Sequence, residues 1–83
     1  MNAKEQTRMF RELVIIRSRL FALECKLSRE PDHLLWIVQL PRESRNLWLE
    51  FERGSWSLRP LGSERKYPVI WNTIMEAIGD ANK

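Results

Sequence analysis

The stretch MFRELVIIRSRLFALECKL, residues 9–27, decides how this chain folds, because it carries the most regular pattern in the sequence. It contains neither glycine nor proline, and its apolar residues recur every three or four positions. That spacing places side chains in one stripe along an α-helix, and the residues of this stripe are Met9, Leu13, Ile16, Leu20, Leu23 and Leu27. We therefore predict one long helix over residues 9–27 that covers a sheet with this stripe, preceded by a polar segment, residues 1–8, that frays.

A second apolar stripe lies on the neighbouring face of the same predicted helix. Its residues are Phe10, Val14, Phe21 and Cys25. Together the two stripes are wider than a single packing contact requires. Two interpretations follow from this surplus. Either a second helix of the same chain packs on the second stripe within one core, or a second copy of the chain covers it across a two-fold axis.

The rest of the chain is typical of strands and one further helix. Apolar residues predict strands over 34–40, 47–53 and 56–59, with a tight turn at Gly54-Ser55. Pro68 is well placed to begin a helix that runs to Ile78 and is capped by Gly79 and Asp80. The predicted fold is α+β, a single domain over residues 1–83 with the order α-β-β-β-α and a three-stranded antiparallel meander between its helices.

The basic residues are unevenly distributed along the chain. There are 14 Lys and Arg residues against 11 Asp and Glu residues, a formal net charge of +3, which indicates a nucleic-acid ligand only if the charges cluster. Several do collect in one sector of the predicted helix that holds no acidic residue, namely Lys4, Arg8, Arg11, Arg19, Lys26 and Arg29. Such a face follows a phosphate backbone, docks against an acidic protein, or is simply solvated.

Residues that could carry chemistry are few. The single Cys25 and the single His33 cannot form a disulfide framework or supply the ligands of a zinc site. Cys25 belongs to an apolar stripe, where a neutral thiol is expected instead of a nucleophile activated by His33. Glu50 and Glu52 share a strand face, but such carboxylates are more typical of cross-strand partners for Arg59 than of acid–base catalysis. We therefore expect no enzyme, no cofactor and no bound metal.

The four tryptophans differ in their predicted faces. Trp36, Trp56 and Trp71 fall on predicted core faces, whereas Trp48 shares its strand face with two carboxylates that would repel a phosphate backbone. An exposed Trp48 is therefore better suited to anchoring a protein interface than to stacking on nucleic-acid bases.

The function favoured by the sequence is that of a non-enzymatic protein-binding module, a small homodimeric regulator, adaptor or inhibitor of a larger protein. Its partner or dimer interface would comprise Phe10, Val14, Phe21 and Trp48. The alternative is a nucleic-acid-binding regulator that uses Arg8, Arg11, Arg19 and Lys26 on phosphates. No apolar run approaches the roughly 20 residues that span a bilayer, and the first residues do not resemble a secretory signal, so we expect a cytoplasmic protein without a membrane span.

Overall fold

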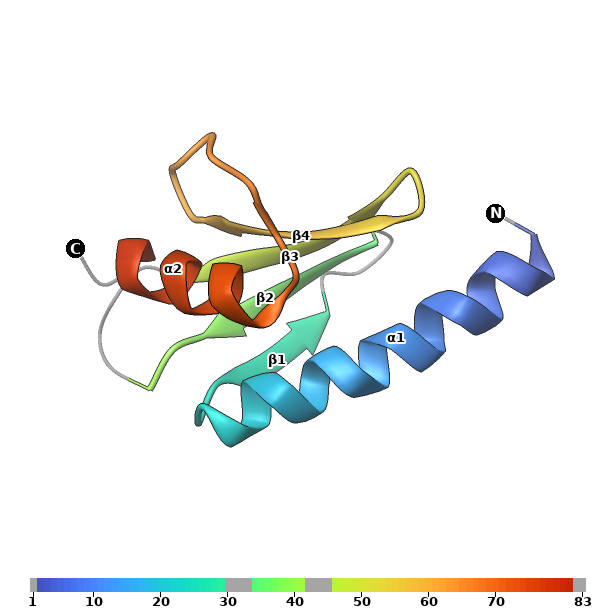
Figure 1. Ribbon diagram of the computed structural model, residues 1–83, viewed down its shortest axis with the longest axis horizontal. Coiled ribbons are helices and arrows are strands. Elements are labelled where there is room, and N and C mark those ends of the chain that lie inside the picture. Colours follow the sequence, from blue (N-terminus) through green and yellow to red (C-terminus); the bar gives the residue numbers. More distant parts are fainter. Residues whose placement is uncertain (1, 30–33, 42–45, 82–83) are drawn as a thin grey trace.

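The structure is a computed structural model that describes residues 2–29, 34–41 and 46–81. These residues form, in chain order, α1 (Ala3–Ala22), β1 (Lys26–Arg29), β2 (Leu35–Gln39), β3 (Leu47–Glu52), β4 (Ser55–Pro60), β5 (Tyr67–Pro68) and α2 (Trp71–Ala81) (Figure 1). The strands make one antiparallel sheet in the order β1-β2-β3-β4-β5. The fold is therefore α+β, as the sequence predicts, but with a five-stranded sheet in place of three strands.

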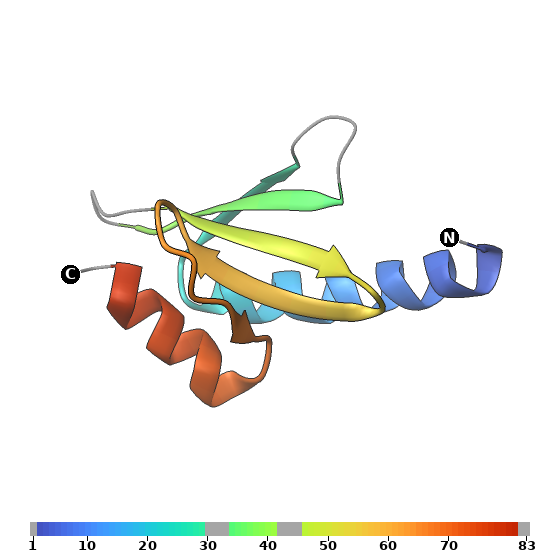
Figure 2. The ribbon, with the colours of Figure 1, turned by 90° about the horizontal axis from the view of Figure 1, so that it is seen from above.

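Both helices pack on the same face of the sheet, so the domain has two layers (Figures 1 and 2). The register aligns Trp36, Leu49 and Leu58 across β2, β3 and β4, and all three side chains are buried. α1 lies along β1, whereas α2 packs against β3, β4 and β5. Because side chains alternate along each strand, the other sheet face holds a different set of residues and carries neither helix.

α1 begins and ends earlier than the sequence predicts. It starts at Ala3, where the Asn2 side chain accepts a hydrogen bond from the Glu5 backbone N–H at 2.8 Å, so the segment predicted to fray forms the first turns of the helix. It ends at Ala22, because Glu24 adopts a left-handed backbone (φ 63°) and the N–H groups of Glu24 and Cys25 donate to the carbonyls of Phe21 and Leu20. The predicted helix over 9–27 is therefore wrong at both ends.

The two additional strands lie at the two edges of the sheet. β1 uses residues that continue the helical spacing in the sequence but pair with β2, with Leu27 opposite Val38. β5 is only two residues long, with Tyr67 opposite Leu58 on β4. The predicted strand over 34–40 corresponds to β2, which lies between β1 and β3, and Trp36 and Val38 on it are buried in the core.

α2 is shifted relative to its prediction. Pro68 lies in β5 and not in the first helical turn, and the helix begins at Trp71. Thr73 organises this end, since its hydroxyl donates to the Pro68 carbonyl and accepts from the Ile70 N–H at 3.2 Å. Gly79 and Asp80, predicted as a cap, lie inside the helix, which continues to Ala81. The resulting contacts with the sheet bury Ile74, Ala77 and Ala81.

Candidate functional site

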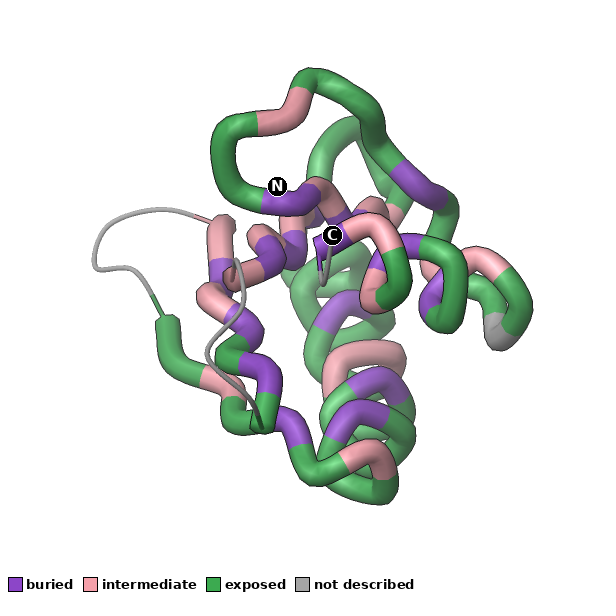
Figure 3. The backbone as a smooth tube through the Cα atoms, turned by 90° about the vertical axis from the view of Figure 1, so that its left-hand side faces the viewer, coloured by how far each residue is buried: buried purple, intermediate pink, exposed green. Residues whose placement is uncertain are grey.

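One face of α1 carries three large apolar side chains that stay exposed among the described residues. Phe10 is 49% exposed, Val14 65% and Phe21 79%, and we call these three residues the outer stripe. The inward side of the same helix is different, since Met9, Ile16 and Leu20 are buried against the sheet. Figure 3 shows the alternation of short buried and longer exposed stretches along α1.

The structure tests the first of the two interpretations of the second stripe, packing by a second helix of the same chain. α2 lies over β3, β4 and β5 and does not pack on the outer stripe, so the prediction of a shared intramolecular core is wrong. Cys25 is also separated from the stripe, because it lies beyond the end of α1 and is buried. The outer stripe therefore has three residues instead of the four predicted from the sequence, and all three are exposed.

Cys25 has the surroundings of a structural thiol. Burial raises its pKa above the ordinary value of 9.0, so the thiol is neutral at physiological pH. Its Sγ lies 3.8 Å from the Leu23 carbonyl oxygen, the contact expected of a weak S–H donor. His33, considered from the sequence as the residue that would activate the Cys25 thiol, lies outside the described residues.

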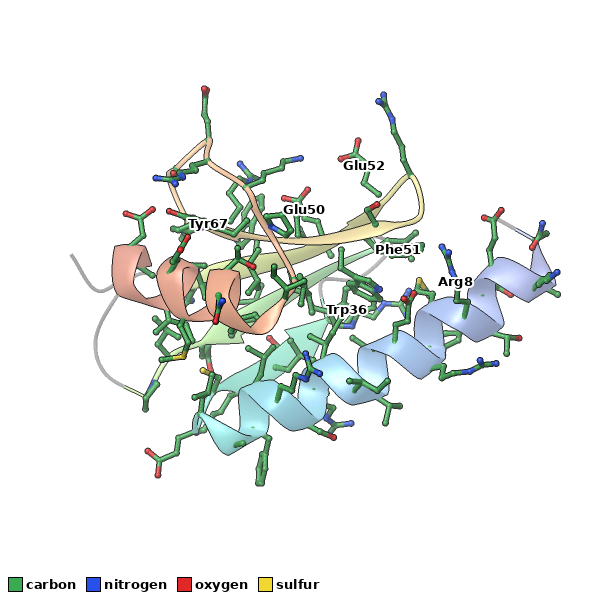
Figure 4. The ribbon with its side chains drawn as sticks, in the orientation of Figure 1. Arg8, Trp36, Glu50, Phe51, Glu52 and Tyr67 are labelled. Atoms are coloured by element: carbon green, nitrogen blue, oxygen red, sulfur yellow. The ribbon has the colours of Figure 1, made fainter. Side chains whose placement is uncertain are left out.

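The open face of the sheet carries an ion-pair network around Trp48. The Arg59 guanidinium lies 4.7 Å from the centroid of the Trp48 ring, and its Nε donates to Glu50 Oε1 at 3.1 Å. Lys66 Nζ lies 3.5 Å from Glu50 Oε2 and 3.4 Å from Glu52 Oε2. Figure 4 shows Glu50 and Glu52 projecting away from α1, on the side opposite to Trp36. The expectation that these carboxylates serve as cross-strand partners is confirmed for Glu50 and Arg59.

This network gives Trp48 a different role from the outer stripe. Trp48 and Arg59 face each other across β3 and β4 and line a shallow hollow of about 640 Å³ with Leu35, Ile37 and the two carboxylates. The indole ring is half-buried beneath the guanidinium. Because Trp48 is on the sheet face that lacks helices, it lies in the layer opposite to the outer stripe, and the two sites are separate surfaces.

The basic residues predicted to contact phosphate are divided among three places. Arg8 and Arg11 border a hollow of about 730 Å³ between α1 and the β3–β4 turn. Arg19 lies near the end of α1, and Lys26 lies on β1, away from the helix on which it was predicted. The hollow also brings in Arg53, because the turn forms at Arg53-Gly54 and not at Gly54-Ser55.

Arg8 is the residue with the most contacts among the four that the sequence predicts to bind phosphate. Its Nη2 donates to the Gly54 carbonyl at 3.1 Å, its Nε lies 3.6 Å from Glu12 Oε1, and its guanidinium is 6.0 Å from the centroid of the Phe51 ring. Figure 4 shows Arg8 reaching from α1 toward the end of the sheet that carries Phe51. Arg8 therefore connects the first half of α1 to the β3–β4 hairpin.

Comparisons with protein-family models, with curated proteins and with solved structures found no match to this chain. Within the described parts of the chain, no helix is long and apolar enough to cross a membrane.

Proposed function

We propose that this protein is a non-enzymatic protein-binding module whose binding face is the outer stripe of α1. The observation that carries the proposal is the exposure of Phe10, Val14 and Phe21 on one side of a helix whose other side is well buried. Removing apolar surface from water stabilises an association by roughly 25 cal/mol per Å². Large apolar side chains aligned along one helix face therefore favour a partner more than single scattered apolar residues do.

We further propose that a second copy of the chain covers the stripe, which makes the protein a small homodimer. A single helix face is self-complementary across a two-fold axis, so each outer stripe would meet its own equivalent. α1 has 20 residues, and at a rise of 1.5 Å per residue it offers a rod about 30 Å long for helix-to-helix packing. The role of the dimer would be that of a regulator, adaptor or inhibitor of a larger protein, and its cytoplasmic location stays a prediction.

Trp48 is assigned a second contact in this proposal, distinct from the dimer face. A tryptophan held beneath an arginine on an open sheet face has the composition of a protein-interface anchor. The larger partner would then bind the sheet layer, while the helix layer holds the two copies together.

Light-scattering mass measured across a wide range of protein concentrations tests the dimer. The wild-type chain of 10.0 kDa is expected to show twice its mass, and Phe21→Glu is expected to show a single chain. Ile15→Glu is the matched control, because Ile15 is 50% exposed but points about 120° away from Phe21 around the helix. It is expected to keep the wild-type mass. A wild-type chain that stays monomeric throughout, or a Phe21→Glu chain that dimerises like the wild type, would contradict the proposal.

A further inference from the structure

A hollow between the first turns of α1 and the β3–β4 turn gathers four basic residues. We call it the basic hollow, and its basic members are Lys4, Arg8, Arg11 and Arg53. Among the described residues, Glu5 is the only acidic one that lines it, and the others are Thr7 and Gly54. Since Lys4, Arg8 and Arg11 point about 100° away from the outer stripe around the helix, the basic hollow is a different surface from the proposed dimer face.

Most of these charges have no partner of opposite sign. Among the described residues, Lys4, Arg11 and Arg53 form no salt bridge, and all three are exposed. Arg8 differs because Glu12, the Gly54 carbonyl and the Phe51 ring hold it in place. Like charges that line the same hollow repel one another, and an anion bound among them would relieve that repulsion.

The fold does not require basic residues at two of these positions. Lys4 is in the first turn of α1, where the helix dipole disfavours a positive charge. Arg53 has a left-handed backbone with φ 52°, followed by Gly54 with φ 78°. A hairpin turn with two positive φ angles favours Asn, Asp or Gly, which adopt that conformation with less strain than arginine. Folding stability therefore does not explain Lys4 or Arg53.

We propose that the basic hollow binds the phosphate backbone of double-stranded nucleic acid, independently of base sequence. Arginine forks match phosphate oxygens in geometry, and three of the four basic residues are arginines. The described lining contains no aromatic ring on which unpaired bases would stack. Nor does this described part of the lining include a large apolar side chain of the kind that anchors protein interfaces. Recognition by charge alone is typical of contacts to a duplex backbone.

Fluorescence anisotropy with a labelled duplex DNA of random sequence, titrated at several salt concentrations, tests this proposal. The test variant is Arg11→Gln combined with Arg53→Asn, because asparagine suits the left-handed position and keeps the turn folded. Losing two phosphate contacts is expected to reduce the slope of log K against log salt by about 1.8 and to weaken binding at low salt by roughly tenfold or more. Circular dichroism verifies that the variant is folded.

Arg19→Gln is the matched control, because Arg19 is an exposed basic residue of α1 that neither lines the hollow nor lies beside the outer stripe. It is expected to keep nearly the wild-type affinity and slope. Polyglutamate replaces the duplex in a second series and is expected to bind much more weakly. Absence of wild-type binding to the duplex, an equal loss per charge in the control, or equally tight binding of polyglutamate would each overturn the proposal.

Discussion

The two helices pack on the same sheet face but use their apolar residues differently. α2 has 11 residues and buries Ile74, Ala77 and Ala81, and among its described side chains only Met75 is a large exposed hydrophobic residue. α1 has 20 residues and also buries three, while four large apolar side chains stay exposed on it, namely Phe10, Val14, Ile15 and Phe21. Packing on the sheet thus covers most of the described apolar side chains of α2, whereas α1 keeps four large apolar side chains that the sheet does not cover. This difference indicates that α2 serves the core and that α1 serves the core and a second surface.

The largest expected effect on stability comes from comparing two neighbouring residues of α1, one buried and one exposed. Leu20→Ala removes a side chain that is 1% exposed and is expected to lower the free energy of unfolding by about 2–5 kcal/mol. Phe21→Ala truncates a side chain that is 79% exposed and is expected to change it by less than about 0.5 kcal/mol in dilute protein. Urea unfolding of both variants measures the difference. Equal losses would mean that the outer stripe belongs to the core after all.

A smaller effect is expected where α1 meets the β3–β4 hairpin. Arg8→Ala removes the hydrogen bond to Gly54 and the guanidinium contact with Phe51, and is expected to lower the free energy of unfolding by about 1–2 kcal/mol. Arg11→Ala is the matched control, because Arg11 has no ion-pair partner among the described residues, and its expected change is below about 0.5 kcal/mol. Thermal unfolding checks both, and a neutral Arg8→Ala variant would show that α1 does not depend on this contact.

A gain in stability is expected at the turn. Arg53→Asn places a residue that tolerates the left-handed backbone at φ 52° and is expected to raise the free energy of unfolding by about 0.5–1 kcal/mol. Arg53→Lys keeps both the charge and the strain, so it is expected to match the wild type. Chemical denaturation distinguishes the two, and a destabilised Arg53→Asn chain would show that the arginine side chain itself supports the fold.

The smallest effect concerns alkaline pH. Burial raises the pKa of the Cys25 thiol in the folded chain above 9.0, so the unfolded chain loses this proton first as the pH rises. The associated stability is complete below about pH 8 and is lost from about pH 9 upward. Unfolding measured from neutral to alkaline pH is expected to show this decline in the wild type and a shallower one in Cys25→Ala. Identical pH profiles would rule out the thiol as its source.

The inner half of the fold follows from the sequence better than its edges do. The spacing of Met9, Ile16 and Leu20 correctly predicts an amphipathic helix, because helix periodicity is a local property of the chain. The end of α1 is missed because Leu23 and Leu27 continue that period, although Glu24 has a left-handed backbone and Leu27 pairs in a strand. β5 is missed because two residues carry no periodic signal.

The candidate sites depend on tertiary placement that the sequence leaves open. The exposure of Phe10, Val14 and Phe21 follows from where α2 packs, and two interpretations fit the sequence equally well. The basic hollow combines Lys4 and Arg11 with Arg53, which is distant in the sequence and comes close only through the hairpin. The local sequence indicates only that Arg53 directly precedes the glycine of the predicted hairpin turn, and not that it lies near α1.

The most direct test of the account is to observe by NMR which side of α1 responds to protein concentration. Val14 and Ile15 are neighbours, 65% and 50% exposed, but only Val14 belongs to the outer stripe. The account predicts that the Val14 methyl resonances shift as the concentration rises while those of Ile15 stay constant, and that Phe21→Glu abolishes the shift. Val14 resonances that do not change with concentration, or Ile15 resonances that shift equally, would contradict the claim that the outer stripe is the binding face.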